Sequence, residues 1–321
     1  MRICYKLRLF IFVLVSIFIV DLGVFRVSVG GDSVKIKKPD ISNKLLFLRN
    51  EDIWAYNPEN KSEKRLTYAG NIRNYAVSAD ATRMAYIRLK NLYVYNTESG
   101  VEEFIAAVST DVSQPSFSPL GDKIALISHT KEEVEVRISY FSKPVKERVR
   151  HIFIADLKTK NFEDVTPDIP YGHSAVSWSP DGRWLSFASF RFGFIDLIDP
   201  SSHKGWSVYL MDLNSSKHKT SKICDGMISV WRTSDQVVVS DDGVGTSVLS
   251  IYDIKTKTLK PSTLIRAGFS PAKFTLGGIN NEIIYYETAD GSDNGLIRSH
   301  NAKTDKTDDV VMNARVPLYV K

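Results

Sequence analysis

The sequence has very little cysteine. Its 321 residues include two, Cys4 and Cys224, and Cys4 stands ahead of an apolar run in a segment that we expect to be removed. The remaining chain then holds Cys224 alone, so an internal disulfide is excluded. This argues against a small secreted domain held together by disulfides. Low-complexity tracts and long charge blocks are also lacking, as is usual for a folded globular chain.

Charge of one sign and familiar enzyme motifs are lacking as well. The 42 basic and 37 acidic residues give a formal charge of +5, and without residues 1–30 about +2 remains, too little to indicate binding to nucleic acid or an anionic membrane. No Gly-x-Ser-x-Gly elbow, phosphate loop or dinucleotide fingerprint occurs. We therefore expect no cofactor and no nucleic-acid partner, and we expect a monomer.

The N-terminal segment has the layout of a secretory signal peptide. Arg2, Lys6 and Arg8 precede an apolar run from 9 to 20, and small residues at 28–30 offer a cleavage site. The run is shorter than the ~18–20 residues of a spanning helix, although an extension through residues 9–25 would make it an uncleaved anchor. We expect a signal peptide (or anchor) at 1–30, a polar linker at 31–43 and a folded domain at 44–321. The predicted location is periplasmic or secreted, or anchored to the membrane by residues 9–25.

Residues 177–189 contain the unit that recurs down the chain. Ser179-Pro180-Asp181-Gly182 predicts a tight turn, and alternating side chains in 184–189 predict the strand after it. Degraded copies align Trp178 with Val77, Phe117, Trp231 and Phe274. A period of roughly 40–45 residues with four strands is typical of a propeller.

Each copy predicts four strands, a to d, with strand a ending at the aligned residue. Strand b is expected at 83–87, 123–128, 184–189, 236–240 and 282–287, strand c at 91–96, 151–156, 206–212 and 248–253, and strand d at 101–105, 162–166, 220–224 and 258–261. Asp or Asn at the end of strand c predicts the turn to strand d.

The two ends of the domain each hold part of one unit. The first unit has strands at 44–48, 52–56 and 64–67 but no strand a, while residues 313–321 look like a lone strand a. Pairing of the two would remove an exposed edge. The predicted fold is all-β, a six-bladed β-propeller of four-stranded blades whose ring is closed by the C-terminal strand.

The turn, the apolar strand and the aromatic strand ending in Asp resemble the WD-like repeats of TolB-type β-propellers over residues 44–320. The turn is complete at 179–182 and departs from the pattern at Leu120 in a second copy. TolB is a periplasmic propeller that binds other envelope proteins and carries an α/β domain before the propeller, which residues 32–43 cannot supply. The repeats are also similar to propeller domains of serine peptidases and of some polysaccharide lyases.

Two copies carry insertions between strands b and c, at 129–150 and 190–205. Long loops in compact domains are commonly functional, and Arg with aromatic residues is typical of interface hot spots. The insertions therefore predict a partner-binding face for a protein or envelope component. The candidate residues are Arg137, Tyr140, Phe141, His173, Arg191, Phe192, Phe194 and Trp206. The alternative interpretation is that the first insertion only extends a β-hairpin with a solvated face.

Four histidines map to the same face and offer a second hypothesis. His129, His151, His173 and His203 are secondary candidates for metal binding. They favour a glycan-active lyase or hydrolase as the alternative function. No His-x-His or His-Glu-x-x-His spacing fixes such a site, so we favour a non-catalytic binding propeller.

Overall fold

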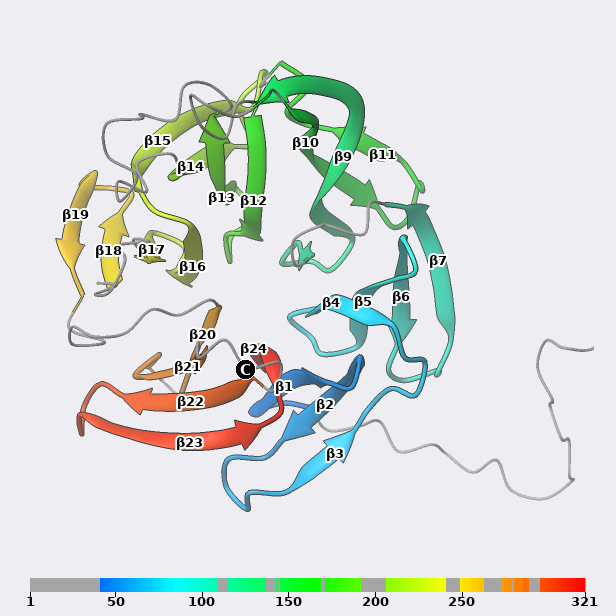
Figure 1. Cartoon of the computed structure of the whole chain (residues 1–321). Coiled ribbons are helices and arrows are strands. Elements are labelled where there is room, and N and C mark those ends of the chain that lie inside the picture. The colour runs from blue at the N-terminus through cyan, green and yellow to red at the C-terminus, as the bar shows by residue number, and fades with distance from the viewer. Residues whose placement is uncertain are drawn as a thin grey trace, which may run out of the picture. The chain divides into compact units, whose positions relative to one another are not determined.

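A computed structural model describes residues 41–108, 115–136, 143, 145–168, 171–191, 206–240, 249–262, 273–278, 280–288 and 295–320. Within these ranges the chain forms 24 strands and no helix, and hence no helix long and apolar enough to cross a membrane. The predicted leader and most of the predicted linker lie outside the described residues. The predicted all-β class is confirmed (Figure 1).

The strands fall into six antiparallel groups of four, which we call units 1 to 6. Unit 1 holds β24 (Arg315–Val320), β1 (Lys44–Arg49), β2 (Asp52–Tyr56) and β3 (Glu63–Arg65). Unit 2 holds β4 (Ile72–Val77), β5 (Arg83–Arg88), β6 (Asn91–Asn96) and β7 (Glu102–Ala107). Unit 3 holds β8 (Ser116–Phe117), β9 (Lys123–Val136), β10 (Val145–Asp156) and β11 (Phe162–Asp164).

Unit 4 holds β12 (Tyr171–Trp178), β13 (Trp184–Arg191), β14 (Trp206–Asp212) and β15 (Lys219–Asp225). Unit 5 holds β16 (Ile228–Thr233), β17 (Gln236–Ser240), β18 (Leu249–Asp253) and β19 (Thr258–Pro261). Unit 6 holds β20 (Phe274–Gly277), β21 (Ile283–Glu287), β22 (Leu296–Asn301) and β23 (Lys306–Met312). Units 3 and 4 form one eight-stranded sheet, because Arg150 of β10 pairs in parallel with Gly172 of β12.

The predicted turn between the first two strands of a unit is confirmed in atomic detail. Ser179 Oγ donates to Asp181 Oδ1 at 2.6 Å and accepts the N–H of Trp184 at 2.8 Å, while Gly182 takes a φ of +75° that favours glycine. In unit 3 the Oγ of Ser118 donates instead to Asp122 at 2.7 Å. Asp122 thus supplies the carboxylate that Leu120 lacks.

The predicted turns after strand c are confirmed as well. Asp156 Oδ1 accepts the N–H groups of Lys158 at 3.0 Å and Thr159 at 2.8 Å, and the backbone reverses at Lys160 with a φ of +60°. The same two side-chain contacts occur at Asn96 and Asn301. A short acceptor side chain that holds its own turn explains why Asp or Asn ends strand c.

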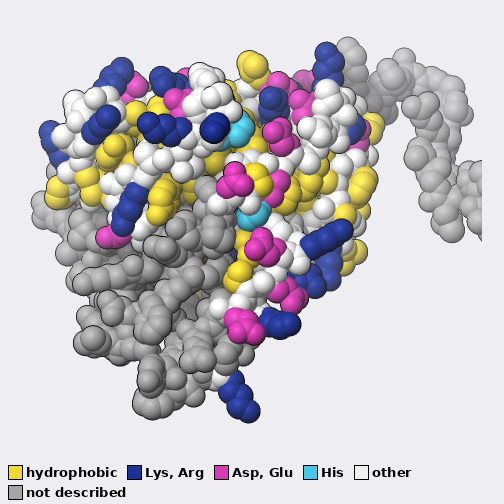
Figure 2. Space-filling model, turned by 90° about the horizontal axis from the view of Figure 1, so that it is seen from above, with side chains coloured by type: hydrophobic (Ala, Val, Ile, Leu, Met, Phe, Trp, Pro, Cys, Tyr) yellow, Lys and Arg dark blue, Asp and Glu magenta, His cyan; other side chains and the backbone are white. Residues whose placement is uncertain are grey.

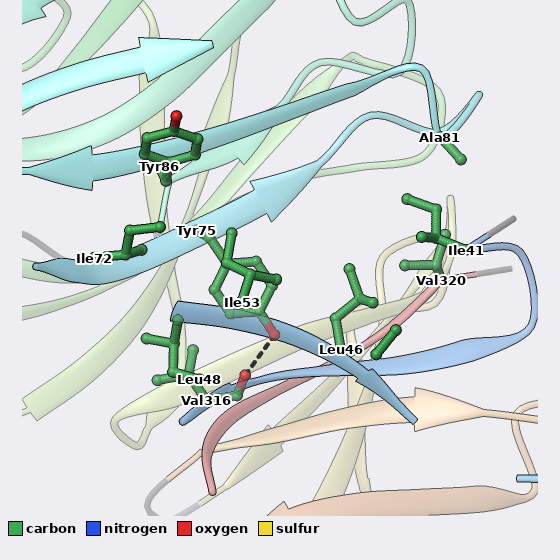
Figure 3. Close-up of a cluster of buried hydrophobic side chains, with 11 residues drawn as sticks. Ile41, Leu46, Leu48, Ile53, Ile72, Tyr75, Ala81, Tyr86, Val316 and Val320 are labelled. Carbon is green, nitrogen blue, oxygen red and sulfur yellow. Dashed lines mark hydrogen bonds between the residues drawn. The ribbon is translucent and has the colours of Figure 1, made fainter. Parts of the chain in front are cut away.

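The second strand of each unit is buried on both faces, each face against a different neighbour. In β1, Leu46 and Leu48 pack with unit 2 whereas Leu45 and Phe47 pack with unit 6. The other clusters lie between units 2 and 3, 3 and 4, 4 and 5, and 5 and 6. Because side chains alternate across a strand, one apolar strand contributes to two cores. Figure 3 shows the cluster between units 1 and 2.

The C-terminal strand completes unit 1, as predicted. Residues Leu318, Tyr319 and Val320 of β24 pair with Leu46, Leu45 and Lys44 of β1. Val316 has a φ of +55°, and Ala175, its predicted equivalent in unit 4, has a φ of +53°. The matched backbone conformation supports the alignment of the last strand with the strand a of unit 4.

The structure differs from the sequence-based prediction at three places. The aligned residue of unit 6 is Leu276, which pairs with Ile284 as Trp178 pairs with Leu185; Phe274 lies two residues earlier. His173, predicted as a partner-binding residue, lies within strand β12, which begins at Tyr171. Strands c and d of unit 6, β22 and β23, were not assigned from the sequence because their alternation is interrupted by polar residues.

Candidate binding surface and central cavity

The first insertion is a β-hairpin that continues past the core of unit 3. Strands β9 and β10 pair from Asp156 and Lys123 outward to Val136 and Val145, and they are the longest strands described. The apolar cluster ends near Ile127 and Ile152. Residues 129–136 and 145–150 therefore extend the hairpin of unit 3.

The outer part of this hairpin is polar and exposed. The exposed side chains are Lys131, Glu132, Glu133, Glu135, Val145, Lys146 and Arg148. Arg148 Nε lies 3.9 Å from Glu133 Oε1, a cross-strand ion pair in contact with solvent, where such pairs contribute ~0–1 kcal/mol. Among the described residues, no apolar cluster includes this part of the hairpin, and an isolated two-stranded hairpin is marginal in water.

Most predicted partner-binding side chains lie outside the described residues. These are Arg137, Tyr140, Phe141, Phe192 and Phe194. Arg191 ends β13 with its backbone paired to Tyr171, and nothing is described of its side chain. Trp206 begins β14, pairs with Phe190 and is partly buried. The second insertion therefore connects β13 and β14, the second and third strands of unit 4.

His151 and His173 lie in the interior, at the junction of units 3 and 4. His151 is 4% exposed and His173 is 0% exposed, and their rings are 6.3 Å apart. His151 Nδ1 lies 2.6 Å from Asp164 Oδ2, and His173 Nδ1 lies 3.2 Å from Ser189 Oγ. A partner cannot touch His173 in this arrangement, so its side chain supports the junction.

The electrostatics of this pair fit an interior role. Burial, with smaller contributions from the charges of His151 and Arg150, lowers the pKa of His173 to about 3. The ring is therefore neutral at neutral pH. His129 pairs across the ladder with Arg150, and His203 lies outside the described residues. In the described ranges no three His, Cys, Asp or Glu side chains gather closely enough to hold a metal ion.

The surface around units 3 and 4 carries both signs of charge. Figure 2 shows Lys and Arg side chains interspersed with Asp and Glu over the described part of this side. No extended patch of one sign is visible there. The distribution offers no continuous basic track of the kind that follows a phosphate backbone.

A cavity of about 390 Å³ lies among the innermost strands of all six units. Its wall includes residues from β4, β8, β12, β16, β20 and β24, largely small or aliphatic. Several polar groups in the wall link neighbouring units: Ser116 Oγ accepts the N–H of Trp178 at 3.0 Å, and Thr275 Oγ1 accepts the N–H of Tyr319 at 3.2 Å.

Among the described residues that line this cavity, Lys273 carries the charged side chain. Lys273 Nζ donates to Asn74 Oδ1 at 3.3 Å. Burial lowers the pKa of Lys273, opposed by the nearby Glu287 and assisted by Arg315. Sequence reasoning missed this residue because the alignment of unit 6 was shifted onto Phe274. With Leu276 aligned, Lys273 falls at the position of Asn74 in unit 2, on the strand that lines the cavity.

The comparisons with known proteins support the fold. No known family model matches the chain. Crystal structures similar to it include TolB from Acinetobacter baumannii, with a TM-score of 0.60 and 18% identity over 88% of this chain and 67% of that one. An oligogalacturonate lyase from Vibrio parahaemolyticus has a TM-score of 0.55 and 15% identity over 83% of this chain and 74% of that one.

A curated relative matches only part of the chain. Dipeptidyl-peptidase 5 of Porphyromonas gingivalis is 30% identical over 120 residues, which are 36% of this chain and 16% of that protein. The chain thus spans about a sixth of the relative's length. At these identities the likeness shows the fold, and the chain has a TolB-like β-propeller fold.

Proposed function

We propose that this chain is an exported β-propeller of six blades that binds a protein or another cell-envelope component and catalyses no reaction. The six blades are units 1 to 6. Their innermost strands touch in the cyclic order β24, β4, β8, β12, β16, β20 and back to β24. Six core clusters, one at each junction, support the same order. Closure of this kind leaves only short outer edges.

The extended hairpin of unit 3 carries the binding proposal. Strands β9 and β10 stay paired beyond the core that they belong to, so the exposed hairpin adds little to the stability of the fold. The predicted binding residues Arg137, Tyr140 and Phe141 lie at its tip in sequence. An element that projects from a rigid scaffold without a core of its own is suited to engage a partner.

Export rests on the basic and apolar N-terminal segment of residues 1–30. We propose that it is cleaved near Gly30 and that the domain acts in the periplasm or outside the cell, as a monomer. Anchoring by residues 9–25 is the other outcome. Mass spectrometry of the exported protein distinguishes the two, because an intact Met1 contradicts cleavage.

Hairpin replacement tests the binding function. Residues 131–147 are replaced by Asn-Gly, which favours a tight hairpin turn, and binding to solubilised envelope protein is measured with the purified domain. We expect loss of binding with a melting temperature within about 3 °C of the parent, because the removed part lies outside the core. Leu120→Ser is the control, since Leu120 is 82% exposed in a turn outside the insertions.

The alternative function, a glycan-active lyase or hydrolase, has its own test. If it holds, purified protein retains stoichiometric Mn, Zn or Ca and cleaves an acidic oligosaccharide. Metal-free protein that still binds its partner through the hairpin contradicts it. Binding that survives hairpin replacement but fails in Leu120→Ser places the partner site on another surface and overturns our proposal.

A further inference from the structure

A cluster of charged and strained groups lies where β20, β24 and β4 meet at the central cavity. Lys273 donates to Asn74 across this corner at 3.3 Å. Glu287, at the end of β21, accepts the N–H of Val316 at 3.1 Å through Oε2 and donates its own N–H to the carbonyl of Lys273 at 3.0 Å. Three units therefore contribute to one corner of the cavity wall.

The backbone at this corner is held in an unfavourable conformation. Val316 is β-branched and has a φ of +55°, which is a rare and strained combination. Its carbonyl accepts a hydrogen bond from the buried Tyr75 hydroxyl at 2.8 Å (Figure 3). Together with the bond that the Val316 N–H donates to Glu287, this fixes both backbone polar groups of Val316. Pro317 and Leu318, directly after it, line the cavity.

Of the described charged groups near this corner, Lys273 is the one that lines the cavity. Lys273 and Arg315 are positive and Glu287 is negative, while the carboxylate of Glu287 is already engaged with the Val316 N–H. The Lys273 ammonium has three donors, and the structure shows a hydrogen bond from one of them. A partly buried ammonium is favoured by an additional anionic acceptor.

The rest of the wall is suited to an aliphatic group. Residues that supply apolar surface include Phe117, Val176, Ile228, Phe274 and Leu318. The volume of about 390 Å³ falls within the ~300–1,000 Å³ of small-ligand sites. It is large enough for a short carboxylic acid or for the last two residues of a peptide.

We propose that the central cavity binds a carboxylate carried on a small aliphatic body, with the Lys273 ammonium against the carboxylate and the apolar wall around the aliphatic part. A single lysine is a point charge, whereas phosphate sites commonly add the arginine fork or several backbone N–H groups. The lining therefore matches a monoanion better than a phosphate. This site is independent of the hairpin that carries the proposed partner binding.

Calorimetric titration of the purified domain tests the site with hexanoate, with N-acetyl-Ala-Leu, and with the amides of both. We expect at least one acid to bind and its amide to bind at least tenfold more weakly, because the charge that faces Lys273 is removed. Lys273→Gln keeps a donor for Asn74 and should weaken binding of the acid at least tenfold. Lys260→Gln, on the exposed strand β19, is the matched control and should leave binding unchanged.

The two acids separate the sources of the carboxylate. Binding of N-acetyl-Ala-Leu but not hexanoate assigns the site to a peptide C-terminus, and comparable binding of both assigns it to small acids. Binding of neither, equal binding of acid and amide, or unchanged binding in a folded Lys273→Gln variant overturns the proposal. The hairpin-replacement variant should bind the acid normally, so failure of this site and failure of partner binding are distinguishable.

Discussion

Units 1 and 3 each have an acidic and a basic side chain paired at the same position, but the inner and outer members of the pair are exchanged. In unit 1, Asp52 at the start of β2 is 2% exposed and accepts from Arg65 Nη2 at 2.5 Å. In unit 3, His151 occupies the equivalent place and Asp164 faces it from β11. The acid lies inside in one unit and outside in the other.

The surrounding frame is the same in both units. Thr67 Oγ1 accepts the N–H of Ile53 at 2.9 Å, and Thr166 Oγ1 accepts the N–H of Ile152 at 2.9 Å. The backbone of both units therefore provides one buried polar position and one position that faces it. Either position can hold the acidic side chain. Complementarity between the two side chains is what the position requires.

The largest effect is expected from removing the inner strand of unit 1 while unit 3 stays complete. Deletion of residues 313–320 exposes the edge of β1 and opens the clusters on both of its faces. We expect a loss of at least about 5 kcal/mol, comparable with the whole stability of many domains. Urea unfolding measures it, and an unchanged midpoint contradicts closure of unit 1 by β24.

The next largest effect compares the inner carboxylate of unit 1 with the outer one of unit 3. Asp52→Asn leaves Arg65 without its carboxylate partner and weakens bonds to Thr67 and Gly70, so we expect a loss of about 2–4 kcal/mol. Asp164→Asn keeps an acceptor oxygen for the Thr166 N–H, and its amide NH2 can donate to the unprotonated Nδ1 of His151, so about 1 kcal/mol is expected. Chemical denaturation measures both losses of unfolding free energy. Equal losses in the two variants would show that it makes no energetic difference whether the acid is the inner or the outer member of the pair.

Acidification should weaken the junction of units 3 and 4 through the buried His173. His173 has a pKa of about 3 in the folded protein and about 6.5 when unfolded, so the unfolded chain takes up the proton first as the pH falls below 6.5. Stability is therefore lost between about pH 6.5 and 3, by about 2–3 kcal/mol at pH 4.5. Melting temperatures against pH measure this, and His173→Asn should flatten that part of the profile.

The smallest effect concerns the two forms of the Ser turn. Asp181→Ala in unit 4 and Asp122→Ala in unit 3 each remove the acceptor for the turn serine, and each should cost about 1 kcal/mol. Leu120→Asp should change the unfolding free energy by less than about 0.5 kcal/mol, because Asp122 already serves the turn. A clear increase in the unfolding free energy of Leu120→Asp would mean that the turn with Asp at this position, as in Ser179–Gly182, is more stable than the turn that relies on Asp122.

Local features were predictable from the sequence because their causes are local. The turns at Ser179 and Asp156 are held by their own side chains, and the apolar alternation of 184–189 specifies a strand whatever surrounds it. Pairing of residues 313–320 with 44–48 followed from counting strands, since one unit lacked its first strand and a lone strand remained.

The site depended on contacts that no local pattern encodes. Burial of His173 follows from the parallel pairing of Gly172 with Arg150, which joins two units into one sheet. Lys273 gains its place from Asn74 and Glu287, which lie on other strands. A shift of two residues at Phe274 was enough to hide it, because it aligned Lys273 with Ala76 of unit 2 instead of with Asn74.

The hydrogen bond between Tyr75 and Val316 joins residues 241 positions apart in the chain. Within units 2 to 6, by contrast, each strand pairs with a strand that directly precedes or follows it in the sequence. Contacts between residues far apart in sequence require a large loop to close and slow the search for the native state. We therefore expect the hairpins to form early and the seam, meaning the contacts of β24 with β1 and β4, to form after them. Interactions made after the rate-limiting step mainly govern how fast a protein unfolds. The seam should consequently set the lifetime of the folded domain, while the repeated hairpins set how quickly it is reached.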